Sequence, residues 1–335
     1  MSYQNLTLKY CTEKIKSALN YRADFFSDKS TTAFRVFNGL ADGIDGLTID
    51  YFNPSNTNDE YYLITWFNID TYKDKKNIVD ALKTSTNYKG IYQKNKINTS
   101  NNTIDIGSDF ICGSEASTPI IIKENDVNFA LYLDDGAMVG IFLDQKDVRK
   151  TIRDKYSNGK TMFNAFSYTG AFSVYSALGG ATKTTSVDLA KRSLPKTSEQ
   201  FGINNIDAKS QDIIVQDVFG YFKYAIKKNI SYDLVVLDPP SFARSKKMTF
   251  SVSKDYVKLL KEAIQITNKG GVIVASTNYS KLNMRVFKEF IEKAFKELNG
   301  KYEIEETFSL PKDFKVLNEH SEENYLKVVF VRRVK

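Results

Sequence analysis

The sequence predicts an α/β protein: a small α+β region followed by an open, mostly parallel sheet with helices on both faces. Two observations support this fold class. After about residue 120, short apolar runs alternate with amphipathic helical segments, a pattern typical of parallel sheets. Runs such as Leu234–Leu237 are apolar without alternation, as expected for strands buried on both faces. With 335 residues, the chain is long enough for two domains.

The first domain is expected over residues 1–120. A helix is predicted at Thr12–Phe26, where Ile15, Ala18 and Leu19 share one face. The strands and the short helix that follow are predicted, in chain order, at Ala33–Phe37, Leu47–Tyr51, Tyr61–Phe67, Lys75–Lys83 (the helix) and Gly90–Lys94. A glycine turn at Asp42–Gly46 joins the first two strands.

The second domain is expected over residues 121–335. Its strands are predicted at Thr161–Ala165, Thr184–Val187, Asp212–Gln216, Asp233–Leu237, Gly271–Thr277 and Leu326–Arg332. The helices between them are predicted at Ala171–Ala177, Ala190–Phe201, Val218–Lys228, Ser253–Thr267 and Asn283–Leu298. In such sheets ligands bind beyond the carboxyl ends of the strands, near the switch in strand order. The loops that follow these strands are therefore where chemistry is expected.

Composition limits the classes of protein to consider. The formal net charge is +7 with a pI of about 9.0, which favours a polyanionic partner such as nucleic acid. Abundant lysine, asparagine and isoleucine could instead reflect coding bias. No run of 18 apolar residues predicts a transmembrane helix, and the N-terminus does not resemble a signal peptide. We therefore expect a cytoplasmic protein without a membrane partner.

Cysteine and histidine give no sign of a metal site or a disulfide framework. Cys11 and Cys112 lie far apart in the chain, and the single histidine, His320, has no cysteine or histidine neighbours. We expect His320 to be a surface residue before the last strand. A reducing compartment is the simplest setting for two unpaired cysteines.

The loop Asn164–Ala171 follows a predicted strand and opens a helix. Gly170 would let the backbone approach a ligand closely. The loop lacks the G-x-G-x-x-G pattern of dinucleotide sites. An ordinary strand–helix turn explains it equally well.

Acidic residues end the next two predicted strands. Asp188 could accept hydrogen bonds from ribose hydroxyls, or it could cap the helix that follows. Asp217 could accept from the exocyclic amine of a nucleobase, or it could cap the helix that begins at Val218. Both readings stay open for each residue.

The fourth loop, Asp238–Phe242, follows the most apolar strand of the chain. Its two prolines fix two φ angles and remove two backbone donors. A rigid loop that presents a carboxylate, carbonyls and an aromatic ring suits a flat, amine-bearing substrate. A simple strand terminator would need neither Asp238 nor Phe242.

Taken together, these loops resemble class I S-adenosylmethionine (SAM) dependent methyltransferases, and more narrowly the bacterial 23S rRNA large-subunit methyltransferases of the cytosine-C5 and guanine-N7 types. The resemblance covers roughly residues 31–335. It rests on the motifs Gly140–Gln145 with Arg149, Phe166–Gly170, Ser186–Asp188 and Asp238–Lys247. It implies a Rossmann-like domain with a mostly parallel, seven-stranded sheet behind a small α+β domain.

The resemblance also implies a role for each site residue. The cofactor SAM would be bound by Asp144, Gln145, Arg149, Asn164, Phe166, Tyr168, Thr169, Gly170, Asp188, Asp217, Val218 and Asp238. The catalytic residues would be Asp238, Pro239 and Phe242, with Asp238 and the Pro239 carbonyl accepting hydrogen bonds from an exocyclic amine. The substrate would be bound by Ser241, Phe242, Arg244, Lys246 and Lys247. A solvated surface loop is the simpler reading of the last three cations.

Two departures from the family pattern bear on the substrate. Many relatives begin with an RNA-binding PUA domain, whereas this chain begins with about 30 residues of predicted helix, so its grip on RNA must come from elsewhere. The cytosine-C5 enzymes use a cysteine near the strand after the Asp-Pro-Pro loop, and the equivalent stretch here, Ser276–Ser280, has none. Carbon methylation needs such covalent activation, so we expect a base nitrogen as the target.

The expected partner is RNA, either 23S rRNA or a ribosomal particle, and a homodimer stays open as the assembly state. Three other functions remain for comparison. A methyltransferase for a protein side-chain amide or a small amine would suit the same loop. A catalytically inactive RNA-binding protein would not need Asp188, Asp217 and Asp238 together. A nicotinamide oxidoreductase would need the missing glycine motif.

Overall fold

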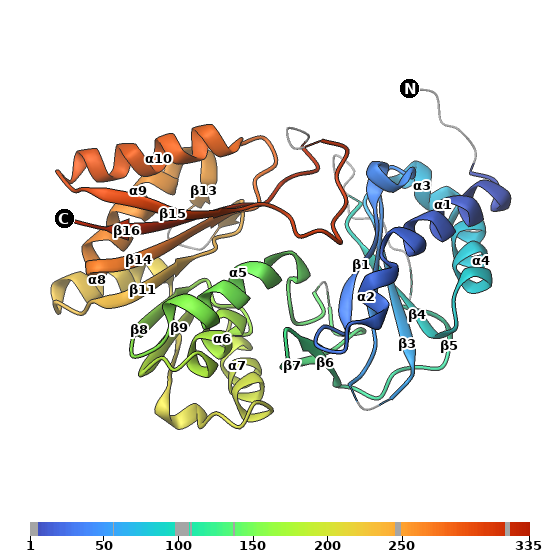
Figure 1. Cartoon of the computed structure of the whole chain (residues 1–335), viewed down its shortest axis with the longest axis horizontal. Coiled ribbons are helices and arrows are strands. Elements are labelled where there is room, and N and C mark those ends of the chain that lie inside the picture. Colours follow the sequence, from blue (N-terminus) through green and yellow to red (C-terminus); the bar gives the residue numbers. More distant parts are fainter. Residues whose placement is uncertain are drawn as a thin grey trace. The chain divides into compact units, whose positions relative to one another are not determined.

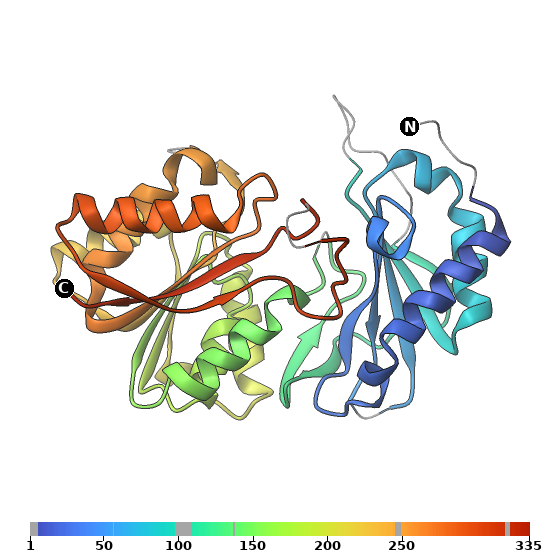
Figure 2. The same cartoon turned by 45° about the horizontal axis from the view of Figure 1, so that its top comes forward.

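The computed structural model describes residues 6–55, 57–97, 107, 109–136, 138–244, 249–318 and 322–335. The chain divides into two compact units (Figures 1 and 2). The first comprises Met1–Leu143 and Pro311–Leu317, and the second comprises Asp144–Leu310 and Asn318–Lys335. No helix in the described ranges is long and apolar enough to cross a membrane.

The first unit is built on a five-stranded sheet of order β1-β2-β3-β4-β5, in which only the β3–β4 pair is parallel. Its strands are β1 (Ala33–Asn38), β2 (Leu47–Phe52), β3 (Glu60–Trp66), β4 (Tyr88–Asn95), β5 (Phe110–Gly113), β6 (Ile120–Glu124) and β7 (Val127–Leu131). Its α-helices are α1 (Leu8–Tyr21), α2 (Ala23–Ser27), α3 (Ile69–Lys73) and α4 (Lys75–Ser85). Ile15 and Ala18 of α1 are buried in its core, so the predicted apolar face is the buried one.

The single helix predicted at Thr12–Phe26 is two helices that meet at Arg22. The Arg22 side chain is fully buried, and its Nη2 lies 2.8 Å from Oδ2 of Asp42. The guanidinium also donates to the Asp313 carbonyl. The backbone leaves helical geometry at Arg22, with φ −108° and ψ 19°.

The division between the units lies beyond the expected position near residue 120. The β6–β7 hairpin belongs to the first unit because it extends the hydrogen bonding at the start of β1. Thr32 donates its backbone N–H to the Lys123 carbonyl, and Asp126 donates to that of Ser30 (both 2.8 Å). Residues 121–143 therefore complete the first unit.

The second unit is built on a seven-stranded sheet of order β10-β9-β8-β11-β14-β16-β15. Its strands are β8 (Thr161–Ala165), β9 (Lys183–Asp188), β10 (Asp212–Val215), β11 (Tyr232–Leu237), β14 (Thr267–Thr277), β15 (Tyr302–Phe308) and β16 (Lys327–Arg333), with a separate hairpin of β12 (Phe242–Arg244) and β13 (Thr249–Ser251). Only β16 runs antiparallel to its neighbours. This arrangement confirms the predicted mostly parallel sheet of a Rossmann-like domain.

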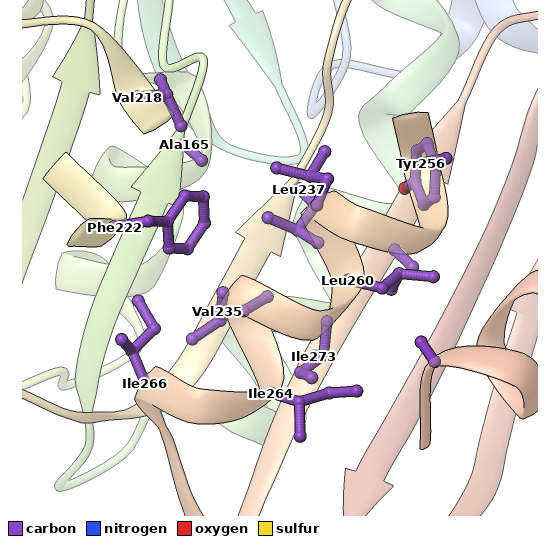
Figure 3. Packing of buried hydrophobic residues seen from close by; sticks show 14 of the residues in the cluster. Ala165, Val218, Phe222, Val235, Leu237, Tyr256, Leu260, Ile264, Ile266 and Ile273 are labelled. Atoms are coloured by element: carbon purple, nitrogen blue, oxygen red, sulfur yellow. The ribbon is translucent and has the colours of Figure 1, made fainter. Parts of the chain in front are cut away.

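Helices cover both faces of this sheet (Figure 1). One face carries α8 (Val218–Lys227), α9 (Val252–Ile266) and α10 (Met284–Glu297), and the other carries α5 (Lys146–Thr151) and α6 (Ala171–Leu178), beside α7 (Ser193–Gly202). Side chains alternate along each strand: Val235 and Leu237 face the first set of helices, and Leu234 and Val236 face the second. Figure 3 shows Val235, Leu237 and Ile273 against the residues of α9. Burial on both faces explains why these strands read as continuous apolar runs.

Candidate active site at the carboxyl edge of the sheet

The loops after β8, β9, β10 and β11 leave the sheet at one edge, because these four strands are parallel. From β8 the chain first adds β9 and β10 on one side, and it then returns to add β11 on the other side. The switch in strand order therefore falls between β8 and β11. The four loops predicted to carry the chemistry all begin at this edge of the sheet. Such sheets bind their ligands there.

The loop after β8 has an unusual backbone. Phe166, Tyr168 and Gly170 all have positive φ angles, of 58°, 51° and 77°. A Cβ at Gly170 would lie 2.4 Å from Cγ2 of Thr197, on α7. Glycine is thus required here both for its conformation and for the close approach of α7. Thr169, between them, is buried.

Asp188 holds this loop in place. Its Oδ2 accepts the backbone N–H of Tyr168 at 2.9 Å, and its Oδ1 accepts that of Ala190 at 2.8 Å. The carboxylate is half-buried and keeps lone pairs for a further donor. It does not cap α7, which begins later than predicted, at Ser193. The turn that Asp188 forms with Ala190 delays the start of that helix.

Asn164, at the end of β8, is almost fully buried. Its amide nitrogen donates to Ser173 Oγ at 3.0 Å, and Ser173 in turn shares a 2.7 Å hydrogen bond with Ser186. Its Oδ1 has no hydrogen-bond partner within the described ranges. A buried carbonyl oxygen without a donor is costly, so this atom is suited to accept from a ligand.

Asp217 serves as the N-cap of α8. Its Oδ2 accepts the backbone N–H of Gly220 at 2.9 Å, so the capping alternative is realised. The Val218 side chain is 3% exposed and packs in the core. Val218 can therefore contact a ligand only through its backbone atoms.

Asp238, at the end of β11, has one oxygen that is firmly held. Its Oδ1 accepts from Gln145 Nε2 at 3.1 Å and from Ser276 Oγ at 2.7 Å. Gln145 Nε2 also donates to Ser276 Oγ at 2.8 Å, so the three side chains form one closed network. In the described part of the chain, no donor reaches the second oxygen, Oδ2. The carboxylate thus presents a fixed and open acceptor.

The surroundings of Asp238 favour its protonated, neutral form more strongly than water does. Burial raises its pKa to about 6, and the nearby Asp144 carboxylate adds to the rise. The hydrogen bond from Ser276, the Arg149 charge and the hydrogen bond from Gln145 oppose it. A carboxyl group that titrates this close to neutral pH is typical of functional sites.

Asp144 and Arg149 come from the segment that precedes β8. Asp144 Oδ2 accepts from the Tyr325 hydroxyl at 2.8 Å. Arg149 is 1% exposed, and its guanidinium lies 5.7 Å from the Phe172 ring centroid. The structure therefore brings Asp144, Gln145 and Arg149 into the electrostatic environment of Asp238.

The rest of the Asp-Pro-Pro loop leads into the β12–β13 hairpin. Pro239 is buried, and Ser241 Oγ donates to Asn278 Oδ1 at 2.6 Å. Phe242 is 62% exposed, so its ring is available for contact with another molecule. The Arg244 backbone pairs with Thr249. Its side chain lies outside the part that the structure describes, as do the predicted Lys246 and Lys247 and the predicted surface residue His320.

Sequence reasoning missed two residues of this site. Ser276 lies one residue before the end of β14, the neighbour of β11, and Tyr256 donates its hydroxyl to the Ser276 carbonyl at 2.7 Å. Ser276 lies near the carboxyl end of a predicted strand, which is the signal that could have found it. Nothing in the local sequence marks Tyr256, which lies within a helix.

Comparisons with known proteins identify the family. The family model for S-adenosylmethionine-dependent methyltransferases matches residues 63–316. YwbD of Bacillus subtilis strain 168, named as a candidate ribosomal RNA large subunit methyltransferase, is 51% identical over 99% of this chain and 82% of its own. Ribosomal RNA large subunit methyltransferase I of Aeromonas salmonicida is 26% identical over 98% of this chain and 82% of its own.

A solved structure is similar over the same extent. The crystal structure of SMU.776, a candidate methyltransferase in complex with SAH, superposes with a TM-score of 0.89 at 39% identity. The match covers 99% of this chain and 83% of that one. Family model, relatives and solved structure agree with one another, and the chain belongs to the S-adenosylmethionine-dependent methyltransferases.

Proposed function

We propose that this enzyme transfers the methyl group of SAM to a base nitrogen of large-subunit ribosomal RNA. The observation that carries the proposal is the Asp238 carboxylate. Its Oδ1 is fixed by Gln145 and Ser276, and its Oδ2 is left as an open acceptor. Such an acceptor beside rigid prolines suits the amine edge of a flat base. The names of the relatives supply the substrate class.

The residues at the carboxyl edge fit SAM. SAM carries a sulfonium and an ammonium, together with hydroxyl and amine donors, so its site should offer acceptors. Asn164 Oδ1 and Gln145 Oε1 are buried acceptors with no partner in the described ranges, and Asp188 keeps acceptor capacity. The glycine at position 170 lets α7 pack closely against this loop. We assign the loop Phe166–Gly170 to the methionine part.

The remaining cofactor contacts follow the loop order. Asp188 is assigned to the ribose. Asp217 and the Val218 backbone are assigned to the adenine, with one oxygen of Asp217 already committed to its helix cap. Asp144, Gln145 and Arg149 are assigned to the side of the SAM site near Asp238. In this scheme Asp188 both orders the loop and binds the ribose, so its two functions are linked.

Bound SAM supplies a methyl group that is already electrophilic, because it is attached to a sulfonium. The enzyme mainly needs to align a nitrogen lone pair, and orientation can contribute roughly 7–11 kcal/mol to such a step. Asp238 Oδ2 and the Pro239 carbonyl would hold the exocyclic amine of the base. The exposed Phe242 ring would stack on it, which is worth about 1–3 kcal/mol. The target base must be unstacked to reach these groups.

The cysteines favour nitrogen over carbon as the target atom. Activation of a pyrimidine C5 requires a nucleophile, for which a thiolate is suited. Cys11 and Cys112 both belong to the first unit. Burial raises the pKa of Cys11 to about 11 and also raises that of Cys112. Both therefore stay protonated at neutral pH, and the second unit contains no cysteine.

Labelled SAM tests the substrate class. The purified enzyme is incubated with it and with deproteinised large-subunit rRNA, intact ribosomal particles or total cell protein. We expect label in the RNA fraction, and loss of at least 100-fold of that label with Asp238→Asn, which keeps the shape but removes the charge. Label that enters only the protein fraction would overturn the rRNA assignment in favour of a side-chain amide.

A further inference from the structure

The first unit contains a surface hollow of about 590 Å³ between α3, α4 and β5. It is lined by Ile69, Tyr72, Lys73, Lys75, Lys76, Val79, Asp80 and Ile111. Its volume lies within the roughly 300–1,000 Å³ typical of small-ligand sites. None of these residues takes part in the carboxyl-edge site of the second unit.

The floor of the hollow is apolar and includes an aromatic ring. Ile69, Val79 and Ile111 supply aliphatic surface, and Tyr72 supplies its ring. That ring is held edge-on against Trp66, with centroids 5.4 Å apart and planes at 76°. Trp66 is fully buried, so the Tyr72 ring has a fixed support. A fixed aromatic surface on an apolar floor suits a flat ring.

Three lysines also line the hollow, and two of them form exposed ion pairs. Lys73 pairs with Asp70 at 2.6 Å and Lys76 with Asp80 at 2.8 Å. The side chains of these lysines are 59% and 89% exposed. Exposed pairs of this kind contribute little to stability, so a polyanion can recruit both ammonium groups at low cost.

Lys75 differs from the other two lysines. It is half-buried, and within the described residues it forms no ion pair with an acidic side chain. Its Nζ lies 5.6 Å from the centroid of the Tyr72 ring. Burial lowers the pKa of its ammonium group, so an anion beside it would relieve that cost.

We propose that this hollow binds single-stranded RNA, with a base against Tyr72 and the apolar floor and with phosphates on Lys73, Lys75 and Lys76. The inference rests on the proposed function, in which RNA is the substrate. Proteins that bind single strands combine aromatic surfaces with cationic rims in this way. An excess of seven positive charges over the whole chain acts in the same direction.

A charge-matched pair of variants tests the proposal. K73S/K75S/K76S removes the three lysines of the hollow. K9S/K16S/K29S removes three exposed lysines of the same unit that do not line it. Binding of a fluorescent single-stranded RNA decamer is measured by anisotropy at several salt concentrations. Thermal melting and SAM calorimetry check that each variant is folded.

We expect the hollow variant to bind RNA on the order of 100-fold more weakly at 0.1 M salt. Its slope of log K against log salt should fall by about 2, which corresponds to about 0.7 per lost phosphate contact. The control should lose less than about 5-fold. Tyr72→Leu should weaken binding by about 5- to 100-fold without changing the salt slope. If the triple variant does not fold, Lys75→Ser alone replaces it, with an expected loss of about 5-fold against Lys16→Ser.

Equal RNA affinity of the hollow and control variants would overturn the proposal, as would equally tight binding of a poly-glutamate peptide in place of RNA. Methylation of rRNA by the wild type is scored separately. If the wild type methylates rRNA while the hollow variants bind and methylate normally, only the hollow proposal fails. If the decamer depends on the hollow but no rRNA is methylated, the proposed function fails and the hollow remains an RNA site.

Discussion

Asp238 illustrates how a side chain gains its role from contacts that lie far away in the sequence. Gln145 and Ser276, which both donate to its Oδ1, are 93 and 38 residues distant. These contacts orient the carboxylate, and burial raises its pKa to about 6. Below that pH the group is protonated and ceases to be an anionic acceptor.

The pH dependence of the reaction follows from this pKa. We predict that kcat/KM for RNA rises with pH through a midpoint near 6, because Oδ2 must be ionised to accept from the base. Ser276→Ala removes a donor that lowers the pKa, so its midpoint should move upward by about one to two units, which corresponds to about 1.5–3 kcal/mol for a hydrogen bond to a charge. Rates from pH 5 to 8 give both midpoints.

SAM affinity at pH 8 serves as the control for that experiment, and it should be the same for Ser276→Ala and wild type. A midpoint that does not move in the variant would show that Ser276 has only a structural role. A flat profile in the wild type would contradict the role assigned to Asp238.

Among the elements, the sequence predicts best where a segment is uniformly buried. β8 matches its predicted bounds, Thr161–Ala165, because its apolar run is buried on both faces. β15 was missed, since Tyr302–Phe308 is an edge strand with three glutamates and mostly exposed residues. The start of α7 was placed too early, because Asp188 forms a local turn with Ala190 that a helical pattern does not reveal.

Gly170 permits a direct test of the loop between β8 and α6. Gly170→Ala should weaken SAM binding at least 10-fold for two reasons. The added Cβ would lie 2.4 Å from Thr197 Cγ2, and the residue would keep a positive φ angle that alanine disfavours. Gly159→Ala is the matched control. It has a φ of 70° and no atom within 4 Å of the added Cβ, so it should cost only about 1–2 kcal/mol of stability.

Thr197→Ser removes the clashing Cγ2, so it should restore part of the SAM affinity of Gly170→Ala. Calorimetry of SAM binding to Gly170→Ala, to the double variant and to Gly159→Ala separates the clash with Thr197 from the effect of the positive φ angle. If Gly159→Ala and Gly170→Ala lose SAM affinity equally, the close packing of α7 has no part in the site.

At the scale of the whole molecule, the first unit depends on a segment that the chain supplies late. Asp313 is fully buried there and accepts the Arg35 backbone N–H at 3.0 Å. Its carbonyl accepts from Arg22, which is 291 residues away. No local sequence pattern indicates a contact between residues so far apart, so the sequence does not predict that Pro311–Leu317 belong to the first unit.

The buried Arg22–Asp42 pair predicts a large effect on stability. Arg22→Met should lower the free energy of unfolding by about 3–5 kcal/mol, because it removes the buried partner of the Asp42 carboxylate and leaves only the more exposed Lys315, at 3.5 Å, to balance its charge. Arg285→Met is the control. Its pair with Glu289 at 3.8 Å is 85% and 56% exposed, so it should change stability by less than about 1 kcal/mol. Denaturant unfolding measures both, and equal effects would contradict a structural role for the buried pair.

The proposed methylation of a base nitrogen in large-subunit rRNA can be tested on cellular RNA. Mass spectrometry measures the rRNA nucleosides of a deletion strain before and after incubation of that RNA with purified enzyme and SAM. We predict that one N-methylated purine nucleoside is lost in the deletion strain and restored by the wild-type enzyme but not by Asp238→Asn. An unchanged nucleoside profile, or the gain of a C5-methylated pyrimidine, would contradict the claim.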